Sequence, residues 1–97
     1  MDADQAKARA NKYLNILATT GASATACEPR KKGPDPMEMA AHALWMCKQV
    51  PRLCVEGKVD TAAEWVRFVE GVLWCTGVMS FEDMTRDAMA PGILTPS

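Results

Sequence analysis

The chain is poor in the residues that build catalytic and metal sites. Histidine occurs once, at His42, and the four cysteines, Cys27, Cys47, Cys54 and Cys75, form no Cys-x-x-Cys pair. His42 and Cys47 are five residues apart, so a helix would place them on different faces. There is also no glycine-rich phosphate-binding loop. We therefore expect a protein that is not an enzyme and that holds neither a cofactor nor a metal.

Patterns that direct a chain to nucleic acid, to a membrane or to export are also missing. Lys and Arg number 11 and Asp and Glu number 12, a net charge of −1 without the basic excess of nucleic-acid binders. The first five residues lack a basic, apolar signal pattern. The longest apolar run, 71–81, is interrupted by Gly77 and is shorter than the roughly 18–20 residues of a membrane span. We expect a cytoplasmic protein with free thiols, and neither nucleic acid nor membrane as a partner.

Apolar residues, in contrast, are plentiful. They make up 48% of the 97 residues, which is enough for one globular domain over 1–97. A domain of this size can bury only part of its apolar surface. The composition therefore favours either a homo-oligomer, with a dimer as the simplest case, or a docking partner.

The apolar residues recur at three- and four-residue spacing without strand-like alternation, which predicts an all-α fold. We expect a small bundle of three to four helices, built on a central antiparallel hairpin of the two middle helices. The expected segments are a helix at 4–20, a loop at 22–34, helices at 36–56 and 61–76, a short helix at 80–90 and a tail at 91–97.

Local signals define the two middle helices. Asp35, Pro36 and Glu38 suit the N-cap, the first helical position and a capping box. The segment 61–64 has the pattern of a second capping box, and the third helix is expected to start at Asp60 or Thr61. Pro51 lies inside the second helix, where it removes a hydrogen bond and predicts a kink or a break.

The two middle helices carry more apolar residues than one buried stripe requires. Trp65 lies on the main stripe of the third helix and is expected in the core. Phe68, Gly71 and Trp74 lie off that stripe, as Trp45 and Met46 do on the second helix. One interpretation is that the first and last helices cover these residues. The other is a partner-binding surface made by Trp45, Met46, Phe68, Gly71 and Trp74.

One basic cluster, Arg30, Lys31 and Lys32, lies in the predicted loop. Such short runs commonly belong to a solvated loop. The alternative function for these three residues is to bind an anionic ligand such as a nucleotide, with several copies brought together by oligomerisation.

The tryptophans, the glycine and the helix starts of segments 42–47, 56–58 and 65–74 resemble the QslA-like family of LasR-specific anti-activators, small helical proteins of pseudomonads and their phages. The resemblance extends over about 39–89, roughly half of the chain. It implies a helical homodimer that binds the ligand-binding domain of a quorum-sensing transcription factor. Such binding would block dimerisation of the regulator and thereby its binding to DNA.

The leading hypothesis is therefore a protein-interaction inhibitor, an anti-activator directed at a host regulatory protein such as a LasR-type transcription factor. The alternative is a phage-encoded counter-defence protein, or a sponge that sequesters a host protein or an anionic signalling nucleotide. The two differ in the residues they use, because the first needs the apolar helix surface and the second needs the basic loop.

Overall fold

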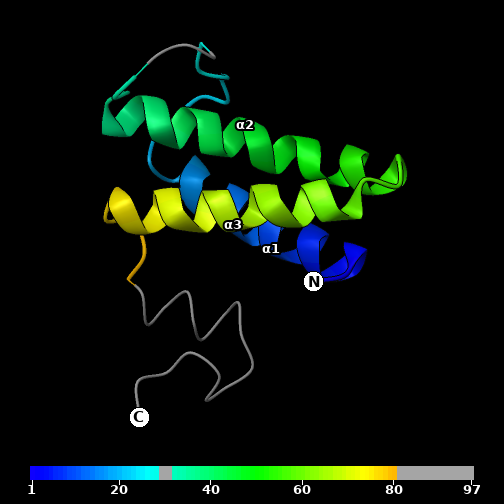
Figure 1. The fold of residues 1–97 in the computed structure, drawn as a ribbon. Coiled ribbons are helices and arrows are strands. Elements are labelled where there is room, and N and C mark those ends of the chain that lie inside the picture. The colour runs from blue at the N-terminus through cyan, green and yellow to red at the C-terminus, as the bar shows by residue number, and fades with distance from the viewer. Residues whose placement is uncertain (29–31, 81–97) are drawn as a thin grey trace.

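The computed structural model describes residues 1–28 and 32–80. These residues form three α-helices and no strand, with α1 at Ala3–Ala18, α2 at Pro36–Val55 and α3 at Val59–Cys75 (Figure 1). The all-α small bundle expected from the spacing of apolar residues is confirmed. The short helix expected at 80–90 and the tail at 91–97 lie outside the described residues from residue 81 onwards.

Helix α2 begins as its sequence predicts. The Asp35 carboxylate accepts a hydrogen bond from the Glu38 backbone N–H at 2.8 Å, and Glu38 Oε1 accepts one from the Asp35 N–H at 3.2 Å. Pro36 occupies the first turn, where its missing N–H costs nothing. Pro51 lies within a helix that runs without interruption to Val55, so the helix is not broken there, and the kink stays a prediction.

Helix α3 begins earlier than predicted, and the capping box expected at Thr61 is wrong. The N-cap is Lys58, whose side chain makes no capping hydrogen bond. The reason is the tight turn that ends α2. Gly57 adopts a φ of +79°, and the Lys58 N–H donates to the Leu53 carbonyl at 2.8 Å. After this Schellman-type ending, Lys58 is already the N-cap of the next helix. Thr61 therefore lies inside the first turn of α3.

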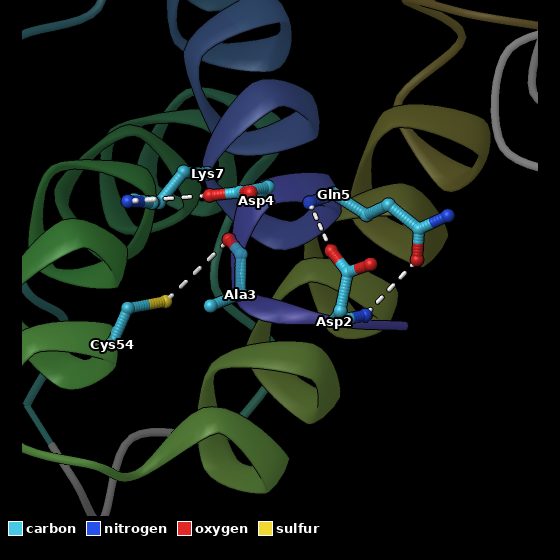
Figure 2. A network of polar contacts seen from close by, with 6 residues as sticks. All are labelled: Asp2, Ala3, Asp4, Gln5, Lys7 and Cys54. Atoms are coloured by element: carbon cyan, nitrogen blue, oxygen red, sulfur yellow. Dashed lines mark hydrogen bonds and ion pairs between the residues drawn. The ribbon is translucent and has the colours of Figure 1, made fainter.

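Helix α1 begins at Ala3, one residue before the expected start, and Asp2 is its N-cap in a capping box. Figure 2 shows the Asp2 carboxylate accepting from the Gln5 N–H at 2.8 Å, while the Asp2 N–H donates to Gln5 Oε1 at 2.9 Å. The same view shows Lys7 paired with Asp4 at 3.7 Å and the Cys54 thiol directed at the Ala3 carbonyl at 3.8 Å. The start of α1 therefore lies against the end of α2.

The core lies where the three helices meet, and α2 packs against both α1 and α3. In Figure 1, α2 and α3 lie side by side. Helix α1 contributes Ala6, Ala10, Tyr13 and Leu17, all at most 1% exposed. The Tyr13 hydroxyl donates to Glu70 Oε2 on α3 at 2.6 Å. None of the helices in the described ranges is long and apolar enough to cross a membrane.

Candidate functional site: an apolar face on α3

The outer side of α3 presents large apolar side chains to solvent. The side chains of Phe68 and Trp74 are 55% and 57% exposed, and Gly71 between them and Cys75 beyond them are exposed as well. Residues three and four positions apart lie next to each other on a helix, so these four form one continuous strip. We call Phe68, Gly71, Trp74 and Cys75 the α3 face.

Gly71 has no packing role within the described residues. It lies in the middle of α3, where glycine destabilises a helix by about 1 kcal/mol relative to alanine. A Cβ atom built at this position would meet nothing within 4 Å. The residue therefore leaves open space between two aromatic positions rather than making room for one of the other two described helices.

The α3 face continues into an aromatic cluster shared with α2. The rings of His42 and Trp45 stack with their centroids 5.6 Å apart, and Trp45 meets Trp65 at 5.7 Å. Phe68 lies edge-on to His42 at 6.4 Å. Trp45 was expected on the surface and Trp65 in the core. Both are half-buried, and their rings pack against each other. Only the Phe68 end of this cluster belongs to the exposed face.

Met46 does not reach the surface. Its side chain is 6% exposed and belongs to the core cluster. The reason is that α2 contacts both α1 and α3, so its buried side is wider than one stripe. Ala43, Val50 and Leu53 share this second buried stripe with Met46. Of the five residues predicted to bind a partner, the structure brings Phe68, Gly71 and Trp74 together on one open face.

The loop before α2 is held by His42, a contact that the sequence did not indicate. The Cys27 backbone N–H donates to His42 Nδ1 at 3.0 Å, and the Cys27 thiol lies 3.6 Å from the Glu38 carbonyl. Helical spacing relates His42 to Cys47, five residues away, but Cys27 is 15 residues away through an irregular loop. No periodic pattern could have connected these two residues.

A cleft of about 430 Å³ lies between this loop and the α3 face. Among the described residues its lining is mainly apolar and carries one carboxylate, that of Glu28, and no lysine or arginine. The described lining residues are Cys27, Glu28, Pro34, Met39, His42, Phe68 and Val72. Of the basic cluster, Lys32 is exposed, while Arg30 and Lys31 lie outside the described residues.

The cysteines differ in chemical accessibility. Cys75 is exposed, Cys27 and Cys54 are half-buried, and Cys47 is 2% exposed in the core. Burial raises the pKa of the Cys47 thiol from 9.0 to about 12, because the thiolate would lose its hydration. Among residues 1–28 and 32–80, no group of three or more His, Cys, Asp and Glu side chains could hold a metal ion.

Thiol alkylation should follow this order of burial. At about pH 8, iodoacetamide should modify Cys75 at least ~100-fold faster than Cys47, which is both protonated and shielded from the reagent. Mass spectrometry of the alkylated peptides over time measures the two rates. In concentrated guanidinium chloride, the control condition, the four rates should converge. Equal rates for Cys47 and Cys75 in the folded protein would contradict the packing described above.

Comparison with known proteins gives no relative: the chain matches no protein-family model, and no curated protein or solved structure is significantly similar to it.

Proposed function

We propose that the protein is a non-enzymatic inhibitor that uses the α3 face to bind a host transcriptional regulator of the quorum-sensing type, blocking its dimerisation or its binding to DNA. The observation that carries this proposal is the exposure of Phe68 and Trp74, each more than half open, on either side of Gly71. Two aromatic rings of this size on the surface of a chain of 97 residues form a concentrated apolar patch.

The shape of the α3 face is suited to binding an apolar helix or side chain. Phe68 and Trp74 are exposed three residues before and three residues after Gly71, where a Cβ atom would meet nothing within 4 Å. An apolar group entering this open space would contact both rings at once. Aromatic residues in such positions commonly contribute most of the binding energy of an interface.

The class of partner is inferred from the resemblance to the anti-activators. Phe68, Gly71 and Trp74 belong to segment 65–74, which carries part of that resemblance, and they are also the residues that form the α3 face. The resemblance implies a regulator that must dimerise in order to bind DNA. A small helical protein that covers the dimerisation surface of the regulator would keep the regulator monomeric. A monomer could not bind both half-sites of the DNA operator.

Substitution of both aromatic residues should abolish this binding. The Phe68→Ser/Trp74→Ser double variant should bind the purified ligand-binding domain of a LasR-type regulator at least ~100-fold more weakly than the wild type, because each ring is expected to contribute about 2 kcal/mol. Isothermal titration calorimetry measures both affinities. Both substitutions replace exposed side chains, so circular dichroism should show an unchanged helix content.

Val55→Ser serves as the matched control. Val55 is 85% exposed at the end of α2 and does not belong to the α3 face, so its removal should leave the affinity unchanged. A wild-type protein that does not bind the regulator domain, or a double variant that binds as tightly as the wild type, would refute the proposed function.

A further inference from the structure

We propose that the cleft beside the α3 face binds a small, uncharged aromatic molecule whose carbonyl group accepts a hydrogen bond from His42. The cleft has a volume of about 430 Å³, which lies within the roughly 300–1,000 Å³ of small-molecule sites. Phe68 lines the cleft and belongs to the α3 face, but the other three residues of that face lie outside the lining. The cleft is therefore a site beside the α3 face, with an occupant of its own.

The walls of the cleft are held in place without a ligand. Helices α2 and α3 form two of them, and the loop at residues 27–28 forms the third. Two hydrogen bonds join this loop to α2. The Thr25 N–H donates to the Ala41 carbonyl at 3.2 Å, and the Cys27 N–H donates to His42 Nδ1 at 3.0 Å. Binding to walls that are already ordered costs little conformational entropy.

His42 provides a hydrogen-bond donor that the described residues do not use. Its Nδ1 accepts from the Cys27 N–H, so the neutral imidazole carries its proton on Nε2, and Nε2 makes no hydrogen bond with a described residue. Contacts with the rings of Trp45 at 5.6 Å and Phe68 at 6.4 Å hold the imidazole in one orientation. A half-buried N–H group requires water or a ligand as its acceptor, and a carbonyl oxygen supplies one.

The remaining lining residues favour an uncharged aromatic ligand. The Phe68 ring and the Met39 thioether both make favourable contacts with aromatic rings. The Cys27 thiol is directed at the Glu38 carbonyl, 3.6 Å away. The described lining contains one carboxylate, that of the exposed Glu28, and no lysine or arginine. A ligand without charge needs no counter-charge from such a lining and is not repelled by the carboxylate.

The fluorescent ketone prodan, a propionyl derivative of dimethylaminonaphthalene, tests the site. It is an uncharged aromatic carbonyl compound whose emission shifts to shorter wavelength in apolar surroundings. Protein titrated into a low, fixed concentration of prodan should cause this shift with a dissociation constant of about 10–200 µM. Dimethylaminonaphthalene, which lacks the carbonyl, should bind about 3–10-fold more weakly because the hydrogen bond to His42 is lost. No emission shift up to about 1 mM protein, or equal affinity for the two compounds, would overturn the proposal.

His42→Phe separates the hydrogen bond from the apolar contacts. Phenylalanine keeps a ring against Trp45 but has no N–H group, so its affinities for the two compounds should agree within about 2-fold. Val55→Ser is the control, because Val55 is 85% exposed and does not line the cleft. This variant should keep the wild-type preference for prodan. A preference that persists in His42→Phe would rule out His42 as the donor.

Nuclear magnetic resonance locates the ligand without any substitution. His42 is the only histidine in the chain, so the histidine ring signals report on this site alone. Prodan should shift these signals while the ring nitrogens keep the pattern of the Nε2–H tautomer. If prodan instead shifted the indole signals of Trp74 and left those of His42 unchanged, it would lie on the α3 face, and the cleft would not be its site.

The ligand site does not depend on the proposed function, because its tests use the protein and prodan alone. Prodan binding without binding of the regulator domain would refute the function and leave the ligand site intact, whereas binding of the regulator domain without prodan binding would refute the ligand site alone.

Discussion

Replacing Leu73 with alanine should lower the free energy of unfolding by about 3 kcal/mol, a large share of the roughly 5–10 kcal/mol expected for a domain of this size. Leu73 is fully buried, and its side chain lies in the core cluster at the end of α3. The truncation removes buried apolar surface and leaves a cavity that the helices can only partly close. Urea denaturation followed by far-UV circular dichroism measures the loss.

Val55→Ala is the matched control for this substitution. The Val55 side chain is 85% exposed, so shortening it should change stability by less than about 0.5 kcal/mol. If Leu73→Ala and Val55→Ala had the same small effect, the placement of Leu73 in the core would be wrong.

Tyr13→Phe should destabilise the protein by about 1–2 kcal/mol. The Tyr13 hydroxyl is buried and donates to the Glu70 carboxylate at 2.6 Å, and hydrogen bonds to charged acceptors are stronger than neutral ones. Phenylalanine preserves the packing of the ring but leaves the carboxylate without this donor. Because Glu70 is only half-buried, water replaces part of the lost interaction, which keeps the expected effect below that of Leu73→Ala.

A double-mutant cycle separates this hydrogen bond from other effects of the substitution. Glu70→Leu removes the acceptor, and the Tyr13→Phe/Glu70→Leu double variant replaces the pair by apolar groups. We expect the double variant to lose less stability than the sum of the two single variants, with a coupling of about 1 kcal/mol. Strictly additive effects would show that the 2.6 Å contact contributes nothing to folding.

The local sequence predicts the start of α2 correctly because all the groups involved lie within four residues. Asp35, Pro36 and Glu38 supply the cap, the fixed φ and the reciprocal hydrogen bond themselves. The start of α3 could not be read in the same way. Thr61 has the right side chain for a cap, but the hydrogen bond from Lys58 back to Leu53 decides where the chain re-enters a helix. That bond depends on how α2 ends.

Helical periodicity predicts part of the candidate site. Phe68 and Trp74 lie off the buried stripe of α3 and are exposed. Met46 also lies off the first stripe of its helix, yet it is buried, because α2 has neighbours on two sides. Helical spacing shows which residues share a face, but not how many faces the fold covers. The contact of Cys27 with His42 cannot be predicted from helical spacing either, since it depends on the path of a loop.

The Tyr13–Glu70 hydrogen bond also determines how α1 is placed along its own axis. A shift of α1 by one turn, about 5.4 Å, would place Ala10 where Ala6 lies, but it would also move the fully buried Tyr13 ring out of its site. The same shift would carry the Tyr13 hydroxyl away from Glu70. The buried Tyr13 ring and its hydroxyl contact with Glu70 thus favour one alignment of α1 along its axis.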